Sequence, residues 1–189
     1  MDNNSRSERT RTAVIQSALT IIARDGPHRL TLDAIAKESG ISKGGVMHQF
    51  PTKQAVIRAL LDHQTQHFEG IYESFMAEQG AEHAHPQLAA RINGAREAIA
   101  QPNSIALAIM AAMAQEPGLL TTQRDNDAGN LAKIRAETDD PDLATLRWLA
   151  ALGMTLSHMI GLSPLSDADR DRLFARLLDE RRWEGLANH

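Results

Sequence analysis

The sequence predicts an all-α protein, and three features of its 189 residues support this. Alanine and leucine dominate an apolar fraction of 42%, whereas aromatic residues make up only 4%. Valine, isoleucine and threonine do not cluster in the alternating runs that are typical of half-buried strands. Apolar residues instead recur every three or four positions, which is the pattern of an amphipathic helix.

Four helices are expected in the first third of the chain. Thr31, Ser42 and Thr52 are suitable N-caps for the second, third and fourth helices, because their hydroxyls can accept from free backbone N–H groups. Gly40 can end the second helix in the left-handed conformation. The expected ranges are about Ser7–Arg24, Thr31–Ser39, Ser42–Phe50 and Lys53–Glu78.

Five more helices are expected in the second half. A surface loop, "EQGAEHAHP", precedes them and contains His83 and His85. The expected ranges are about Pro86–Ala100, Ser104–Gln115, Pro117–Glu137, Leu143–Leu162 and Ser166–Arg182.

The last two helices are expected to form a dimer interface. Leu143–Leu162 carries one charge, Arg147, and is apolar on all sides, so it should be buried on more than one side. Two such helices from each chain would make a four-helix core, and the alternative is burial within one monomer. Small residues form one stripe: Ala150, Gly153, Ser157 and Gly161. On the last helix the apolar stripe is Leu173, Phe174, Leu177 and Leu178, with Arg170, Arg172 and Arg176 outside it.

Charge and composition narrow the function. Residues 1–65 carry a net charge of +3 and residues 66–189 one of −7, which indicates that the N-terminal part meets a polyanion. The sequence has no cysteine, which excludes disulfides and thiolate metal sites. It has no apolar signal segment and no apolar run long enough to span a membrane, so a cytoplasmic location without membrane contact is expected.

The stretch "SGISKGGVMHQFPTKQAV", from Ser39 to Val56, has the spacing of a helix-turn-helix. Val46 and Phe50 share one face of the second short helix and should pack inward on Ile35 and Ile41. Each glycine costs a helix roughly 1 kcal/mol relative to alanine. The adjacent Gly44 and Gly45 therefore indicate a close approach of the backbone to the first helices or to DNA.

The outward face of this helix has the residue types that a major groove can use. Lysine donates to guanine, glutamine pairs with adenine, and histidine bonds a base or a phosphate. Lys53, at the start of the fourth helix, can hold a phosphate with nearby backbone N–H groups. The predicted DNA-binding residues are Thr31, Ser42, Lys43, Gly44, Gly45, Met47, His48, Gln49, Thr52 and Lys53.

The segment from Thr10 to Leu61 resembles the DNA-binding domain of the TetR/AcrR family of bacterial transcriptional regulators. The matching residues are "TLDAIAKESGISKGGVMHQFPTKQAV" and the preceding "IIARDG". The resemblance implies a homodimeric all-α protein with a helix-turn-helix domain, residues 1–52, and a larger effector-binding and dimerisation domain, residues 53–189. The family often has Thr in place of Gly45 and Tyr in place of Met47, so base contacts are expected to depend more on Lys43, His48 and Gln49.

The sequence therefore predicts a ligand-responsive repressor that is released from double-stranded operator DNA by a small, mainly apolar effector. Apolar side chains, and a few side chains that carry a polar group, are candidates to contact this effector. Most of them could equally belong to the hydrophobic core. They are Tyr72, Phe75, Leu107, Met110, Met113, Trp148, Met154 and His158, and Leu152 and Met159 are further apolar candidates.

Two other functions remain open. The chain could be a small-molecule-binding helical protein with little DNA affinity, for which the paired glycines and Met47 are the best support. His63 and His67 have the spacing of metal ligands on a helix, which a metal-dependent enzyme would use. No catalytic motif accompanies them, so no enzyme activity, metal or cofactor is expected.

Overall fold

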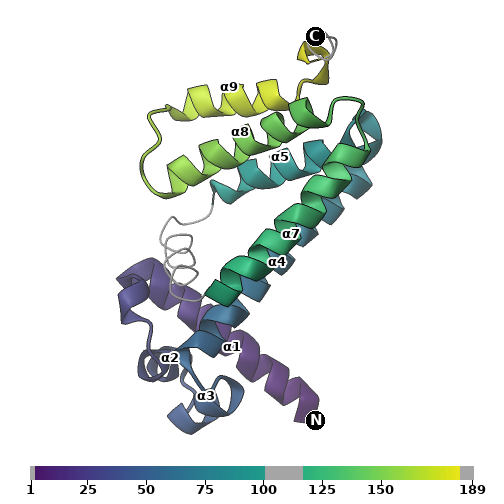
Figure 1. The fold of residues 1–189 in the computed structure, drawn as a ribbon. Coiled ribbons are helices and arrows are strands. Elements are labelled where there is room, and N and C mark those ends of the chain that lie inside the picture. The colour runs from purple at the N-terminus through teal and green to yellow at the C-terminus, as the bar shows by residue number, and fades with distance from the viewer. Residues whose placement is uncertain (1–2, 101–116, 184–189) are drawn as a thin grey trace. The chain divides into compact units, whose positions relative to one another are not determined.

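The computed structural model describes residues 3–100 and 117–183, and every regular element in these ranges is a helix (Figure 1). This confirms the all-α prediction. The predicted helix Ser104–Gln115 lies outside the described residues. None of the described helices is long and apolar enough to cross a bilayer. The α-helices are α1 (Asn3–Asp25), α2 (Leu32–Ser39), α3 (Lys43–Gln49), α4 (Lys53–Glu78), α5 (Pro86–Ala98), α7 (Pro117–Ala136), α8 (Pro141–Met159) and α9 (Asp167–Leu178).

Several helix ends differ from the predicted ones, and α8 ends at Met159, three residues before the expected Leu162. Helix α1 begins at Asn3, about a turn before the expected start. Helix α8 begins at Pro141 because the carboxylate of Asp140 caps it, accepting from Leu143 N at 2.9 Å. Helix α9 ends at Leu178, and the next residues form a separate 3-10 turn. The three 3-10 turns of the described chain are Pro27–Arg29, Gly80–Glu82 and Glu180–Arg182.

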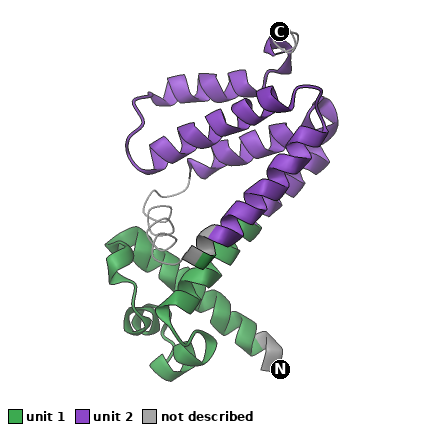
Figure 2. Ribbon diagram, in the orientation of Figure 1, with its two compact units in different colours: residues 1–66, 102–119 green, residues 67–101, 120–189 purple. Residues whose placement is uncertain are grey.

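The chain divides into two compact units, coloured in Figure 2. Unit 1 comprises residues 1–66 and 102–119, and unit 2 comprises residues 67–101 and 120–189. The division lies within α4, so this helix contributes its first half to unit 1 and its second half to unit 2.

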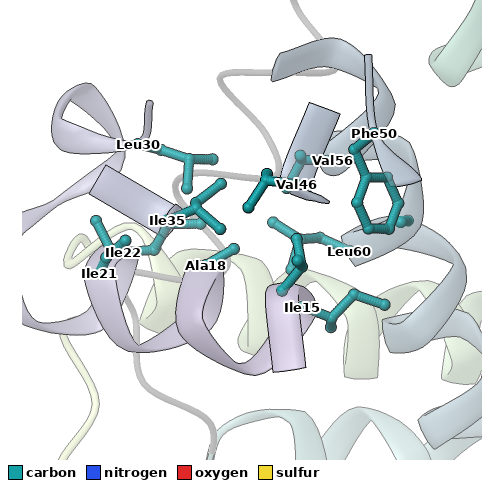
Figure 3. Packing of buried hydrophobic residues seen from close by; sticks show 12 residues of the cluster. Ile15, Ala18, Ile21, Ile22, Leu30, Ile35, Val46, Phe50, Val56 and Leu60 are labelled. Carbon is teal, nitrogen blue, oxygen red and sulfur yellow. The ribbon is translucent and has the colours of Figure 1, made fainter. Parts of the chain in front are cut away.

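Unit 1 is held together by one apolar core that α1, α2, α3 and the first turns of α4 share (Figure 3). Gly26 has a φ of 85° and lets the chain turn after α1, which brings α2 back against it. The predicted inward contacts of Val46 and Phe50 are confirmed. The buried members are Val14, Ile15, Ala18, Ile21, Ile22, Leu30, Ile35, Val46, Phe50, Val56, Ala59 and Leu60.

Unit 2 has its main core between α5, α8 and α9. Small side chains such as Ala95 and Ala151 are buried where α5 and α8 pack together, which allows close approach of the two helices. Thr155 strengthens this contact, because its hydroxyl donates to Ala95 O at 2.8 Å. The buried members are Leu88, Ile92, Ala95, Ile134, Ala144, Trp148, Ala151, Phe174 and Leu177.

One face of α8 is apolar and exposed. Leu146 is 63% exposed and Leu149 is 52% exposed, although both lie in the middle of a helix whose opposite face is core. Ala150 and Gly153, from the predicted small-residue stripe, are exposed as well. The expectation that α8 is buried on more than one side is therefore not met within the single chain.

Two arginines are buried in unit 2. Arg147 Nε donates to the carbonyl oxygen of Leu177, in the last turn of α9, at 3.1 Å. Burial lowers the pKa of the Arg147 guanidinium. Arg170 was predicted to lie outside the apolar stripe of α9, and this is wrong: the residue is only 8% exposed. It tolerates burial because its guanidinium donates to Asp167 Oδ1 at 2.8 Å and to His158 Nδ1 at 3.2 Å.

The segment before α5 is fixed by two carboxylates that lie far away in the sequence. Glu137 accepts from Gln87 N at 2.9 Å and from Leu88 N at 2.8 Å, so it caps α5. Glu180 accepts from the backbone N–H groups of Ala84 and His85. The predicted loop is thus held by specific hydrogen bonds on both sides.

Candidate nucleic-acid interface

Helices α2 and α3 form a helix-turn-helix whose ends are capped as the sequence predicts. Thr31 Oγ1 accepts from Ala34 N at 3.0 Å, and α2 ends at Gly40, whose φ is 68°. The turn continues through Ile41 to Ser42, whose hydroxyl accepts from Gly45 N at 3.1 Å. Because each cap lies within three residues of its partner, the local sequence is sufficient to set both helix starts.

Helix α3 presents one face to solvent. Val46 and Phe50 point into the core of unit 1 (Figure 3), and this fixes the rotation of the helix. The opposite side chains are exposed, and Gln49 is half-buried at the edge, which confirms the predicted outward face. The exposed members are Lys43, Gly44, Met47 and His48.

The two glycines of α3 have different surroundings. A Cβ at Gly45 would lie 2.9 Å from Ile41 Cγ2 and 3.2 Å from Ser42 Oγ, which is too close for ordinary contact. A Cβ at Gly44 would meet no atom within 4 Å. The packing of unit 1 therefore accounts for the glycine at 45, and nothing in the described fold requires the glycine at 44.

Two side chains on this face already have partners. Lys43 Nζ lies 2.9 Å from Asp33 Oδ1 and 3.1 Å from Asp33 Oδ2, across the turn between α2 and α3. Gln49 Nε2 donates to Ser7 Oγ in α1 at 2.8 Å. Sequence reasoning missed both partners, because each pair depends on how two different helices pack together.

The start of α4 adds further polar groups. Thr52 Oγ1 caps the helix by accepting from Ala55 N at 3.1 Å, and its hydroxyl hydrogen is free to donate elsewhere. Lys53 is exposed in the first turn. Arg11, in α1, places its guanidinium 5.1 Å from the centroid of the ring of Phe50, which lies just before α4. Exposed cations and a helix N-terminus are suited to phosphate oxygens.

Two sequence profiles of known families match the chain. A profile described as Tetracyclin repressor-like, C-terminal domain, matches residues 84–181, which is more than half of the chain. A profile described as bacterial regulatory proteins, tetR family, matches residues 14–60, which contain the helix-turn-helix. The chain belongs to the tetR family of bacterial regulatory proteins.

Individual relatives agree with this assignment. The HTH-type transcriptional regulator UidR of Escherichia coli (strain K12) is 36% identical over 62 residues, which are 32% of this chain and 32% of UidR. The match thus spans about a third of this curated relative. Among solved structures, Salmonella enterica GusR has a TM-score of 0.61 and 17% identity, with 89% of this chain and 93% of GusR covered. The multidrug binding protein EbrR, complexed with imidazole, has a TM-score of 0.64 and 17% identity, covering 94% and 91%. These structural likenesses concern the fold.

The predicted effector residues of this TetR-family chain do not converge on one described site. Phe75 is buried against α5 and stacks on His83 with ring centroids 5.4 Å apart. Tyr72 donates its hydroxyl to Gln87 Oε1 at 2.6 Å, and Arg91 lies over its ring. Leu107, Met110 and Met113 lie outside the described residues.

The candidates on α8 have different surroundings. Trp148 belongs to the core of unit 2, and Met154 packs against that core. His158 is half-buried beside Arg170. The guanidinium has no lone pair to offer, so His158 Nδ1 is the acceptor of this hydrogen bond.

The described residues offer no group of three or more His, Cys, Asp or Glu side chains placed to hold a metal ion. His63 is half-buried on α4, and its Nδ1 has no hydrogen-bond partner within the described chain. The His63 and His67 pair of the sequence thus has no third ligand in these ranges.

Proposed function

We propose that this TetR-family chain is a homodimeric repressor that binds operator DNA through α3 and releases it when a small, mainly apolar effector binds the C-terminal domain, residues 53–189. The observation that carries the proposal is the face of α3. A helix of seven residues is firmly capped and anchored by two buried side chains, yet Lys43, Met47 and His48 point to solvent. A helix of this length is not stable alone, and the core of unit 1 holds it in place. A rigidly held helix with an exposed polar face is what insertion into a major groove requires.

Within this face the residues have different roles. Lys43, His48 and Gln49 contact base edges, and Gln49 must first exchange Ser7 for a base. Lys53 and the hydroxyls of Thr31 and Thr52 contact phosphates, which sets the position of the protein without selecting sequence. Met47, 44% exposed, offers an apolar contact to a thymine methyl group.

The homodimer forms through α8 and α9 in this proposal. Exposed leucines in the middle of a helix are unfavourable in water, and a second copy of α8 would cover them. Helix α9 contributes less than its sequence suggests, because Phe174 and Leu177 are already buried within unit 2. The exposed large apolar residues on and just after α8 are Leu146, Leu149, Leu152, Leu156 and Leu162.

The effector would bind in the C-terminal domain, residues 53–189, as the fold shared with EbrR, which is complexed with imidazole, supports. The candidate contacts are those of the sequence: Tyr72, Phe75, Leu107, Met110, Met113, Trp148, Met154 and His158. Release from DNA requires that the effector bind more tightly to a conformation whose two α3 helices do not match the half-sites.

The test is a binding titration by fluorescence anisotropy with duplexes from the DNA upstream of the protein's own gene. The wild-type protein is expected to bind one duplex as a dimer, with affinity that falls steeply with salt. Lys43→Ala should reduce discrimination between duplexes, and Lys53→Ala should weaken all of them alike. If the wild-type protein binds no duplex at low salt, the chain is the alternative, a small-molecule-binding protein with little DNA affinity.

A further inference from the structure

The ion pair between Asp33 and Lys43 places a negative charge on the face that is proposed to meet DNA. Asp33 lies in the first turn of α2 and Lys43 in the first turn of α3, and both carboxylate oxygens lie within 3.1 Å of Nζ. The side chains are 71% and 58% exposed. The pair is therefore on the solvent side of the helix-turn-helix.

This pair contributes little to the stability of unit 1. Exposed ion pairs have small net free energies because water screens both charges. The two helices are already held by the cap of Thr31, the turn at Gly40 and the buried core. A carboxylate in a pair that contributes little to the fold, next to a lysine on the proposed DNA-binding face, is expected to have its main effect on binding.

We infer that Asp33 is a specificity-determining residue that lowers the affinity of α3 for non-specific DNA by neutralising Lys43. On an arbitrary sequence, Lys43 can reach only phosphates, and the carboxylate opposes this contact. On the correct site, the guanine edge replaces Asp33 as the partner of Lys43, so the loss of the ion pair is offset. The inference rests on the proposed DNA binding.

A second ion pair on α2 provides a matched control. Glu38 lies in the last turn of α2, and its Oε2 is 2.9 Å from Arg24 Nη2, at the end of α1. This pair is five residues further along the helix and includes no residue of α3. Glu38→Gln removes the same charge from the same helix as Asp33→Asn, and thus controls for the net charge of unit 1.

The experiment compares the wild-type protein, Asp33→Asn and Glu38→Gln on two duplexes of equal length. One duplex is the sequence that wild-type protein selects from a randomised pool, and the other is a scrambled version of it. Affinities are measured by anisotropy over a range of salt concentrations. Thermal unfolding by circular dichroism checks that the three proteins are equally stable.

Asp33→Asn is expected to bind the scrambled duplex about two- to fivefold more tightly, the range of an exposed ion-pair interaction. The slope of log K against log salt on this duplex should become more negative by about 0.9, the value for one additional phosphate contact. Affinity for the selected duplex should change less, so selectivity falls. Glu38→Gln should match the wild-type protein on both duplexes.

Three results would overturn the inference. One is an unchanged slope and affinity of Asp33→Asn on the scrambled duplex. Another is a loss of affinity confined to the selected duplex, which would make Asp33 a base contact that accepts from cytosine. The third is an equal gain in Glu38→Gln, which would be an effect of net charge alone. Failure of the wild-type protein to select any sequence would instead refute the proposed function, and the inference with it.

Discussion

Replacing each glycine of α3 by alanine separates the packing of the helix from its contact with DNA. A Cβ at Gly44 enters open space, so Gly44→Ala should gain the helix propensity of alanine, about 0.5–1 kcal/mol of unfolding free energy. A Cβ at Gly45 is 2.9 Å from Ile41 Cγ2, and the side chain of Ile41 must shift to admit it. Overpacking of this kind costs about 1–3 kcal/mol, which exceeds the gain in propensity, so Gly45→Ala should be destabilising.

Gly44→Ala should weaken DNA binding although it raises the stability of the protein. If Gly44 is small because the backbone of α3 approaches DNA closely, Gly44→Ala should bind the operator roughly tenfold more weakly, about 1.4 kcal/mol. Urea unfolding followed by circular dichroism gives the stabilities, and anisotropy with the selected duplex gives the affinities. A Gly44→Ala protein that is more stable and binds DNA as well as the wild-type protein would refute the role assigned to Gly44. A destabilised Gly44→Ala protein would contradict the open space at this position.

Three further predictions concern unit 2. If the proposed dimer forms through α8, Leu149→Glu should make the protein a monomer in sedimentation velocity, because it places a charge in the exposed leucine face of α8. The control Ala132→Glu, on the exposed side of α7, should have the oligomeric state of the wild-type protein. Glu137→Ala should lower the free energy of unfolding, measured in urea, by roughly 1.5–3 kcal/mol, because the N–H groups of Gln87 and Leu88 lose a charged acceptor. An unchanged free energy of unfolding would mean that water replaces the carboxylate as the acceptor. Hydrogen bonds from Ser166 and Arg172 hold the pKa of Asp169 below its ordinary value of 3.8. Asp169 therefore stabilises the fold above that pH and loses the effect as pH falls through its lowered pKa, and Asp169→Asn should remove part of the acid-induced decrease in stability.

Helix starts could be predicted from sequence where the determining contacts are local. Thr31, Ser42 and Thr52 each accept from an N–H three residues later, so the cap and its partner lie in the same short stretch of sequence. The outward face of α3 followed as well, because Val46 and Phe50 are four residues apart and only one rotation of the helix buries both.

Contacts between distant residues could not be predicted in this way. The capping of α5 by Glu137 and the docking of Glu180 on the segment before it join residues about 50 and 95 positions apart. Arg170 looked like a surface residue because its spacing places it beside the stripe of α9. It is buried because Asp167 and His158 supply acceptors there, and the second of these comes from another helix.

The exposed face of α3 is free to vary because its fold depends on other residues. The cap at Ser42, the close approach at Gly45 and the two buried anchors, Val46 and Phe50, position the helix. A side chain such as Met47, which makes none of these contacts, can differ from the tyrosine that the family often has without loss of the fold. The identity of the exposed residues is therefore evidence about the ligand of α3 alone, and their substitution should change which DNA is bound before it changes the stability of unit 1.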